Sequence, residues 1–382
     1  MINYKLGKGE ITMKTFLVGV GAAGNKAVLS AVETGVINVD DTMIVNTTSK
    51  DFPKEYEGQK IMLSDGDTGC GKERGAAKEY AQIAMKEGKF NLTQKMAGYT
   101  TVIIVTSVEG GTGSGATPLI AKMFSKVYVK NVHIIAFTGF EDDVRGLANT
   151  VEFFKEIGPA IIVQTISNKA FMNQANNNKL RAEELANYEM GTRIRVLTGQ
   201  DFIEGRQNID DTDILKLSNT SGYMTVEKKV FNKPLETNSD YERIVKNMIY
   251  NSASIHCENP APQRIGVILN IKPESEDAID FTFDSIKKEY CGDGKAFEMF
   301  TQVQWDGKKE YIAYIVSGMK MPIDEVKAIY DRYIEETNKI DKANDDFFAD
   351  VQSMKLDDAD KKFNMIREVN KGMSITDFLN EN

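Results

Sequence analysis

The sequence is poor in the residues that build disulfide frameworks and zinc sites. Its 382 residues include three widely spaced cysteines, Cys70, Cys257 and Cys291. An odd number at such spacing argues against a disulfide framework and suits a reducing compartment. The two histidines, His133 and His256, are too few for a zinc site of several histidines, and a Ser-His-Asp hydrolase would need one of them. His133 stands in an apolar run and His256 in a polar stretch, so we assign neither a chemical role.

Long hydrophobic runs are missing as well. No apolar segment approaches the length that crosses a bilayer, and the first fifteen residues lack the shape of a signal peptide. We therefore expect a cytoplasmic protein without a membrane partner. The formal net charge of −9 disfavours broad, sequence-independent DNA binding by the protein body. A local DNA contact, or a basic adaptor bound to DNA, stays possible.

Short apolar runs alternate with helical patterns through the first half of the chain. The runs predict strands, and the patterns between them predict helices at residues 25–34, 74–86 and 118–126. Such alternation is typical of an α/β fold with a mostly parallel, Rossmann-type sheet covered on both faces. Ligands of such sheets bind at the carboxyl ends of the strands. The strands are expected at residues 15–20, 42–48, 101–108, 132–138 and 160–167.

The second half has a different order of predicted strands and helices. A polar, helix-forming stretch begins near residue 176, and a second, smaller α/β domain follows it, with strands at 264–272, 298–304 and 310–318 and a helix at 283–290. A further helix is predicted from residue 323 to about residue 340, followed by a charged tail that forms a surface helix or is disordered. The predicted organisation begins with an arm (residues 1–14), a nucleotide-binding domain (15–175) and a central helix (176–200). A second domain (201–320) and a C-terminal helix with its tail (321–382) follow.

Two glycine-rich stretches admit more than one reading. Residues 19–24 follow a predicted strand and open a helix, which suits a phosphate but also fits an NAD site. The next strand ends at Asn46, Thr47 and Thr48 without the acid that would bind the ribose of NAD, although Asp51 is near. Residues 66–73 come close to a Walker A loop, but Glu73 replaces the magnesium-binding hydroxyl and would repel phosphate.

The third glycine-rich stretch is the most specific. It follows the predicted strand at 101–108 and precedes a helix expected from about Pro118. Four glycines in six positions leave a loop whose backbone N–H groups can face a polyphosphate, and Thr112 and Ser114 add hydroxyl donors. The stretch consists of Gly110, Gly111, Thr112, Gly113, Ser114 and Gly115.

These six residues resemble the signature G-G-T-G-[ST]-G of the tubulin/FtsZ superfamily, and the chain looks closest to its TubZ branch. The resemblance implies a tubulin-like GTP-binding domain that holds GTP or GDP with Mg²⁺. Asn25 and Asn168 would then meet guanine, and either Glu141 or Asp142 the ribose. The positions that match the family's nucleotide loops are Gly21, Ala22, Asn25, Asn46, Thr68, Gly69, the six signature residues, Glu141, Asp142 and Asn168, with Asn187 and Tyr188, or alternatively Glu183, on the central helix.

An acidic stretch supplies the second part of the resemblance. Asn208, Asp210 and Asp213 form the pattern Asn-x-Asp-x-x-Asp, similar to the synergy loop N-x-D-F-A-D-V of FtsZ. The resemblance implies that these three residues complete GTP hydrolysis. A helical spacing of three brings both carboxylates to one face. The alternative is an acidic helix N-terminus, where aspartates simply favour the helix dipole.

The resemblance also implies assembly. The nucleotide loops and the acidic stretch would lie at opposite ends of a subunit, so the acids of one subunit would reach the GTP of the next. Such a head-to-tail contact does not close on itself and generates filaments. A carboxylate with a pKa of about 4 is ionised at neutral pH and can orient a water. We therefore expect a GTP hydrolase stimulated by its own assembly.

The C-terminal part of the sequence favours the TubZ branch. It lacks the hydrophobic, proline-containing peptide by which FtsZ binds membrane anchors, and a long helix follows the second domain. TubZ implies the segregation of plasmid or phage DNA in a bacterial host, through a TubR-like adaptor on a centromere-like site. Lys361, Lys362 and Arg367 are candidate contacts for that adaptor, or else belong to a solvated charged face. The rival functions are an FtsZ-like division ring and an NAD-dependent oxidoreductase.

Overall fold

The computed structural model describes residues 13–129, 131–158, 160–231, 237–250, 252–257, 261–276, 283–290 and 297–353. Residues 1–12 of the predicted arm, Cys291, and the tail with Lys361, Lys362 and Arg367 lie outside the described residues. The chain divides into two units, residues 1–331 and residues 332–382. In the described part of the chain, no helix combines the length and the apolar character needed to span a bilayer.

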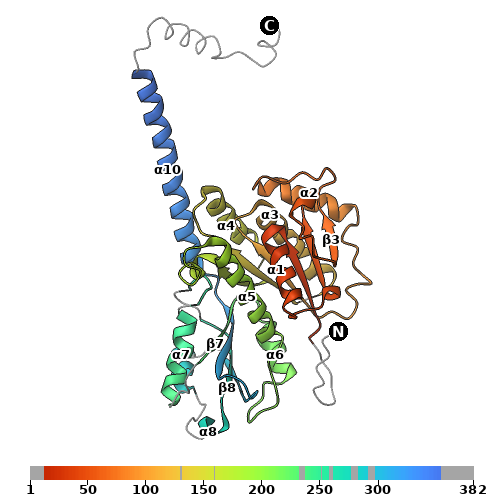
Figure 1. Cartoon of the computed structure of the whole chain (residues 1–382), viewed down its shortest axis with the longest axis vertical. Coiled ribbons are helices and arrows are strands. Elements are labelled where there is room, and N and C mark those ends of the chain that lie inside the picture. Colours follow the sequence, from red (N-terminus) through yellow and green to blue (C-terminus); the bar gives the residue numbers. More distant parts are fainter. Residues whose placement is uncertain are drawn as a thin grey trace, which may run out of the picture. The chain divides into compact units, whose positions relative to one another are not determined.

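A single mixed sheet of ten strands forms the centre of the first unit (Figure 1), in the order β3-β2-β1-β4-β5-β6-β7-β10-β8-β9. Neighbouring strands are parallel, except that β10 runs antiparallel to both β7 and β8. This arrangement confirms the predicted α/β fold with a mostly parallel sheet. The strands are β1 (Thr15–Val20), β2 (Thr42–Asn46), β3 (Gln59–Met62), β4 (Thr101–Ser107), β5 (Asn131–Thr138), β6 (Ile162–Ser167), β7 (Gly222–Val230), β8 (Arg264–Asn270), β9 (Glu298–Gln304) and β10 (Tyr311–Met319).

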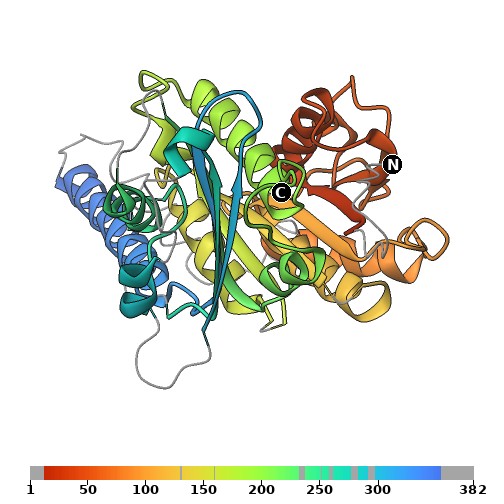
Figure 2. The same ribbon diagram turned by 90° about the horizontal axis from the view of Figure 1, so that it is seen from below.

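Helices lie on both faces of this sheet (Figure 2). Short 3-10 helices, η1 (Val39–Asp41), η2 (Ser49–Asp51) and η3 (Asn168–Phe171), connect some of the elements. Helix α10 crosses the border between the two units. The α-helices are α1 (Gly21–Glu33), α2 (Arg74–Lys86), α3 (Gly111–Val127), α4 (Val144–Glu156), α5 (Lys179–Leu197), α6 (Asp211–Ser218), α7 (Asn238–Tyr250), α8 (Pro273–Glu276), α9 (Asp284–Tyr290) and α10 (Ile323–Ser353).

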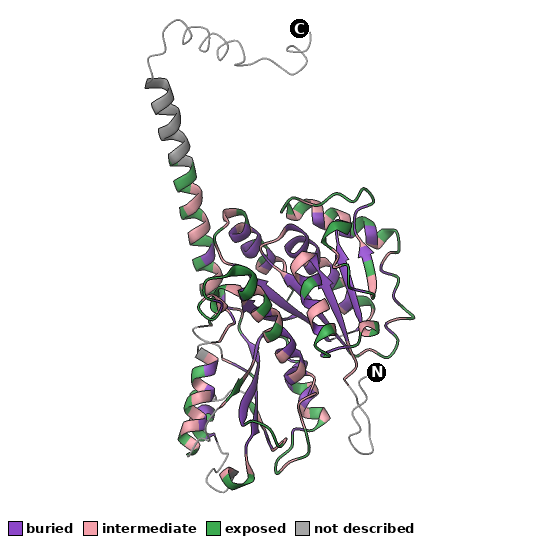
Figure 3. Ribbon diagram, in the orientation of Figure 1, coloured by how far each residue is buried: buried purple, intermediate pink, exposed green. Residues whose placement is uncertain are grey.

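Each face of the sheet has its own hydrophobic core, because alternate residues of a strand point to opposite faces. Val18 and Ile104 join one core, under α2, α3 and α4, whereas Leu17 and Ile103 join the other, under α1, α5 and α6. Strands β5 and β10 are buried along their whole length. The buried residues follow the strands in Figure 3, which agrees with the continuous apolar runs that predicted them.

Helices α1 and α3 leave neighbouring strands on opposite faces of the sheet. Helix α1 follows β1 and buries Val28 in one core, and α3 follows β4 and buries Phe124 in the other. Since β1 and β4 pair directly, the strand order reverses between them. In parallel sheets this switch point opens a crevice at the carboxyl ends of the strands, where ligands bind. The first and third glycine-rich stretches both lie there.

The structure corrects several predicted boundaries. Helix α1 begins at Gly21 rather than near residue 25, and α3 begins at Gly111 rather than near Pro118. The expected glycine loops are therefore mostly first turns of helices, because first-turn glycines can approach neighbouring backbone that a side chain would block. Helix α10 extends to Ser353, beyond the expected end near residue 340.

Some elements were not predicted at all, among them β3, α4, β7, α7 and α8. Strands β7 to β10 also continue the sheet of the first half through the β6–β7 pair, so the expected second domain shares one sheet with the first. Residues 1–331 form one unit, and the borders expected at residues 175, 200 and 320 stay predictions.

Candidate functional site

The three glycine-rich stretches meet at one end of the sheet, and residues 19–24, 66–73 and 110–115 are called the glycine end below. A Cβ atom on Gly21, whose φ is +78°, would lie 3.1 Å from the backbone nitrogen of Gly113. A Cβ on Gly111 would lie 2.6 Å from the carbonyl carbon of Lys72. The first and second stretches therefore both pack on the start of α3. The N–H groups of the first helical turn have no partner within the helix, so this end can take an anion.

Several glycines of this end have no room for a side chain. A Cβ on Gly24 would lie 2.2 Å from the carbonyl oxygen of Val105, and a Cβ on Gly113 2.3 Å from that of Ser107. A Cβ on Gly115 would lie 2.4 Å from Arg74 O. Gly110, by contrast, has nothing within 4 Å of its Cβ position, so the space in front of α3 is open at this residue.

Hydroxyl and thiol groups lie around Thr112, in the first turn of α3. Its Oγ1 is 3.0 Å from Thr47 Oγ1 and 3.2 Å from Cys70 Sγ. Asp67 Oδ2 accepts a hydrogen bond from Ser49 Oγ at 2.6 Å, and this bond lowers the pKa of Asp67. Thr68 and Gly69, predicted to contact nucleotide, are exposed beside these groups. The loop at 66–73 thus forms one side of the glycine end. It is not a Walker A loop.

Three predicted contact residues point inward. Ser114 is fully buried, and its Oγ donates to Gly110 O at 2.5 Å, so its hydroxyl stabilises the first turn of α3 instead of facing a ligand. Asn25 is also fully buried, and in its favourable orientation Nδ2 donates to Gly21 O at 3.2 Å and Gly19 O at 3.0 Å. Asn46 is buried and its Oδ1 accepts from Thr47 N at 2.8 Å. These side chains hold the backbone in place, and a base contact by Asn25 stays a prediction.

Glu109 is a residue of this site that the sequence analysis missed, although it directly precedes the signature. Its Oε1 accepts from the backbone nitrogens of Gly139 at 3.0 Å and Glu141 at 3.3 Å. Burial raises the pKa of Glu109 above its usual value. Asn149 of α4 adds a second link, because its Nδ2 donates to Lys72 O and Glu109 O. Glu109 thus holds the loop after β5 close to the start of α3, and Asn149 links α4 to Glu109 and to the loop at 66–73.

Ion pairs cross the outer rim of the glycine end. Glu141 has a φ of +58°, and its carboxylate pairs with a lysine of η3. Hydrogen bonds from lysines lower the pKa values of Asp142 and Asp143. Both ribose candidates are therefore already paired, and neither is preferred by geometry. The pairs are Lys72–Asp143 at 2.5 Å, Glu73–Arg145, Glu141–Lys169 at 3.1 Å and Asp142–Lys179.

The candidates for the base lie on η3 and α5. Asn168 begins η3, directly after β6. On α5, a Cβ on Gly191 would lie 3.2 Å from Val36 Cγ2, just beyond α1. Asn187 lies one helical turn before Gly191 and shares its face, whereas Tyr188 is 69% exposed. The helix therefore turns Asn187 toward α1 and Tyr188 toward solvent.

The predicted catalytic residues lie in a separate loop, residues 201–210, called the acidic loop below, and in the first turn of α6, which follows this loop and contains Asp213. Asp210 is the N-cap of α6, and its Oδ1 accepts from Asp213 N at 2.8 Å. Asp213 also pairs with Lys216 at 3.2 Å. Asn208 Oδ1 accepts from Gly205 N at 2.9 Å, and its Nδ2 donates to Gly205 O at 3.1 Å. The acidic helix N-terminus named as an alternative is thus present, and it places Asp210 and Asp213 next to each other.

Helix α5 separates the two groups of residues. Its N-terminus follows η3 at the carboxyl end of β6, and the acidic loop comes after its C-terminus. A helix of 19 residues is about 28 Å long, because each residue adds about 1.5 Å. Near its C-terminus Gln200 Nε2 donates to Val36 O at 3.0 Å, between α1 and β2, which is the amino end of the strands. The glycine end and the acidic loop therefore lie near opposite ends of α5.

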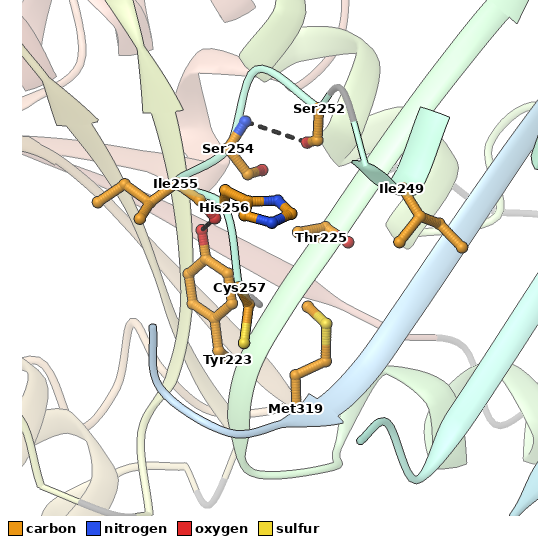
Figure 4. A pocket seen from close by; sticks show the side chains of 9 residues that line it. All are labelled: Tyr223, Thr225, Ile249, Ser252, Ser254, Ile255, His256, Cys257 and Met319. Carbon is orange, nitrogen blue, oxygen red and sulfur yellow. Dashed lines mark hydrogen bonds between the residues drawn. The ribbon is translucent and has the colours of Figure 1, made fainter. Parts of the chain in front are cut away.

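A pocket elsewhere in the first unit belongs to neither group (Figure 4). Tyr223, His256 and Cys257 are among its lining residues, and Tyr223 OH donates to Ile255 O at 3.0 Å. His133, the other histidine, is fully buried in β5, and burial lowers its pKa to about 4. The full burial of His133 argues against a role for this histidine in hydrolysis.

The first half of the chain matches a known protein family. Residues 14–176 match the Tubulin/FtsZ family, GTPase domain. Residues 14–176 belong to the tubulin/FtsZ family. The recognition based on the signature at 110–115 is thereby confirmed, and the glycine end lies within the tubulin/FtsZ domain.

Similarity also extends beyond this tubulin/FtsZ domain. The chain is 25% identical over 210 residues to the cell division protein FtsZ of Mycoplasmopsis pulmonis (strain UAB CTIP), which covers 54% of this chain and 53% of FtsZ. The match thus spans about half the length of that relative. Among solved structures, Clostridium botulinum phage c-st TubZ has a TM-score of 0.62 at 17% identity, covering 85% of this chain and 98% of TubZ. CetZ2 from Haloferax volcanii, a GTPγS-bound protofilament, has a TM-score of 0.67 at 18% identity, covering 86% and 100%. These structures show a shared fold.

The glycine end fits a nucleotide polyphosphate. The first turns of α1 and α3, which follow β1 and β4, carry backbone N–H groups without helical partners, and Gly110 leaves open space in front of α3. No group of three or more histidine, cysteine or acidic side chains that could hold a metal occurs among the described residues. Mg²⁺ does not need such a cage, since it usually binds through substrate phosphates and few protein groups.

Proposed function

We propose that this protein is a GTPase that hydrolyses GTP at the contact between stacked copies of itself. The observation that carries the proposal is the separation of the glycine end from the acidic loop by the length of α5, about 28 Å. A carboxylate at one end cannot touch a γ-phosphate at the other end of the same molecule. Only a second copy, stacked head to tail, brings the two together, and such stacking produces a filament.

Each end has its own task in this proposal. Backbone N–H groups of Gly111, Thr112 and Gly113 bind the phosphates, with Thr112 Oγ1 as an added donor. Asn168 and Asn187 would contact the base in this proposal. Asp210 and Asp213 of the neighbouring copy orient the attacking water and accept its proton. Mg²⁺, when bound, neutralises phosphate charge.

The central test removes the carboxylate of Asp213 in the first turn of α6. Asp213→Ala is expected to bind GTP and assemble with a slowly hydrolysed analogue, but to lower turnover by about 100-fold, the scale of a lost general base. Asp211→Ala is the matched control, since Asp211 lies in the same helical turn but outside the matched pattern. GTP turnover per assembled subunit is the measurement. Equal turnover in wild type and Asp213→Ala would remove this residue from the mechanism.

Dependence on concentration tests the stacking itself. Turnover per molecule should rise steeply with protein concentration and disappear in dilute, monomeric protein. Thermal stabilisation by GTP, but not by NAD or ATP, would separate the proposal from an oxidoreductase. A rate per molecule that is independent of concentration would contradict the shared site.

For the biological role we propose the segregation of plasmid or phage DNA. The shared fold with a phage TubZ and the long helix α10 support it. Full-length filaments should co-sediment with a centromere-like DNA carrying a TubR-like adaptor, and truncation after residue 340 should abolish this. Retained binding by the truncated protein would exclude the tail as the receptor.

An FtsZ-like division ring is the second candidate, because the curated relative with the sequence match is a cell division protein. That function requires filaments tethered to a membrane through an adaptor. Binding of the filaments to vesicles that carry membrane-anchor adaptors, without binding to adaptor-coated DNA, would favour division over segregation.

A further inference from the structure

Two buried glutamines of β9 contact the acidic loop. Gln302 and Gln304 are 2% and 1% exposed, and both point to the face of the sheet that α5 and α6 cover, since Val303 between them belongs to the opposite core. A buried amide costs free energy unless its hydrogen bonds are satisfied. Here the partners are backbone groups of the acidic loop.

Gln302 binds the loop at both of its ends. Its Oε1 accepts from Ile209 N at 2.6 Å, directly before Asp210, and its Nε2 donates to Ile203 O at 2.7 Å. Nε2 also lies 3.2 Å from Asn208 Oδ1. Since Ile209 is the residue before the N-cap of α6, this side chain fixes the start of the helix that carries both carboxylates.

Gln304 fixes the beginning of the loop. Its Oε1 accepts from Ile203 N at 3.0 Å, and its Nε2 donates to Asp201 O at 2.7 Å and to Tyr311 OH at 3.0 Å. The two glutamines are joined by a hydrogen bond from Gln302 Nε2 to Gln304 Oε1 at 3.1 Å. They therefore act as one connected group.

The backbone of β9 holds the same loop from the side. Val303 N donates to Gln207 O at 2.9 Å, and the two residues form an isolated antiparallel bridge. A Cβ on Gly205 would lie 2.0 Å from Val303 O, so the loop runs directly against the strand. Asn208 was expected to be catalytic, but its side-chain oxygen and nitrogen both form hydrogen bonds with the backbone of Gly205. Its contacts are those of a residue that shapes the loop.

We propose that Gln302, Gln304 and Asn208 are positioning residues that hold Asp210 and Asp213 where a neighbouring copy's nucleotide can meet them. Neutral amides suit this task because they bind backbone groups without neutralising the carboxylates. The inference rests on the proposed function, since it concerns the half of the site that the acidic loop supplies.

The test replaces Gln302 by a side chain of similar length that cannot form these hydrogen bonds. Gln302→Met should lower GTP turnover per assembled subunit by about tenfold or more, because a misplacement of about 1 Å in a catalytic group can cost up to about 100-fold. GTP affinity should stay within about twofold, since the glycine end is untouched. Thr301→Val, on the same strand, is the matched control and should keep wild-type turnover.

A double variant separates positioning from a general loss of structure. In the Asp213→Ala background, Gln302→Met should cause no further loss of turnover, because both changes act through one carboxylate pair. Amide hydrogen exchange at residues 201–210 should accelerate in Gln302→Met while exchange in β1 and β4 stays unchanged. The inference would be overturned if the two losses of turnover multiplied in the double variant. It would also be overturned if amide hydrogen exchange in the loop stayed unchanged in Gln302→Met.

The two proposals fail in different ways. Low turnover in Asp213→Ala together with wild-type turnover in Gln302→Met would refute the positioning role and leave the shared site intact. Wild-type turnover in Asp213→Ala would refute the shared site. If Gln302→Met does not fold, the exposed Asn208→Ala replaces it, with turnover expected to fall at unchanged GTP affinity; unchanged turnover there contradicts the inference.

Discussion

The glycine end and the acidic loop are held in place by different means. At the glycine end, backbone lies against backbone, as where a Cβ on Gly24 would come within 2.2 Å of Val105 O. At the acidic loop, buried side-chain amides do this work, and Gln302 reaches Ile209 across 93 positions of sequence. The glycine end therefore depends mainly on missing side chains, whereas the acidic loop depends on close backbone contact at Gly205 and also on side chains from a distant strand. Substitutions that add or remove a few atoms should affect the two ends differently.

The largest expected effect is at Gly113. In Gly113→Ala the new Cβ would lie 2.3 Å from Ser107 O, so the start of α3 must shift. Overpacking of this kind typically costs about 1–3 kcal/mol of unfolding free energy. GTP affinity, measured by titration, should fall at least about tenfold. Gly75→Ala is the control: its Cβ meets nothing within 4 Å and should stabilise α2 slightly. Wild-type affinity in Gly113→Ala would refute the role assigned to this backbone contact.

A substitution of the same kind at the other end should change a different property. In Gly205→Ala the Cβ would meet Val303 O at 2.0 Å and push the acidic loop away from β9. We expect turnover per assembled subunit to fall about tenfold at unchanged GTP affinity. Paired binding and turnover measurements on Gly113→Ala and Gly205→Ala check this. Loss of nucleotide binding in Gly205→Ala would show that the two ends are not independent.

A smaller effect is expected from the buried carboxyl of Glu109. Burial raises its pKa in the folded protein above the unfolded value, so its contribution to stability is fully present below the unfolded pKa and is lost as pH rises through the folded pKa. Glu109→Gln removes this titration. The wild type should therefore lose stability relative to Glu109→Gln as pH increases from about 4, as measured by denaturant unfolding at several pH values. Parallel stability curves would contradict this explanation.

The smallest effect should come from the rim of the glycine end. Lys179 pairs with Asp142, but both side chains are about half exposed. Exposed pairs contribute less than about 1 kcal/mol and are screened by salt. Lys179→Met should change the unfolding free energy by no more than this, with the difference vanishing at high ionic strength. Lys155→Met, which removes the exposed pair with Glu152, is a matched control. A larger, salt-independent loss would mean that the rim supports the site.

The sequence by itself indicated the strands of the first half other than β3, and the glycine-rich stretches. Strands β1 and β9 and helix α2 begin and end where the apolar pattern predicted, because that pattern is local. The signature at 110–115 indicated a phosphate site because glycine is needed wherever backbone must approach backbone, whatever the distant sequence is. The family match of residues 14–176 confirmed the recognition based on this signature, and phosphate binding by these residues stays a prediction.

Only the tertiary structure decided the surroundings of those residues. It turned Ser114 and Asn25 inward, placed Glu109 under the loop after β5, and made Asp210 a helix cap. It also brought Gln302 and Gln304 to the acidic loop. Such contacts join positions that are far apart in the chain, and no local pattern records them. Which hydrogen bonds a buried polar side chain makes is set by the neighbours that folding supplies.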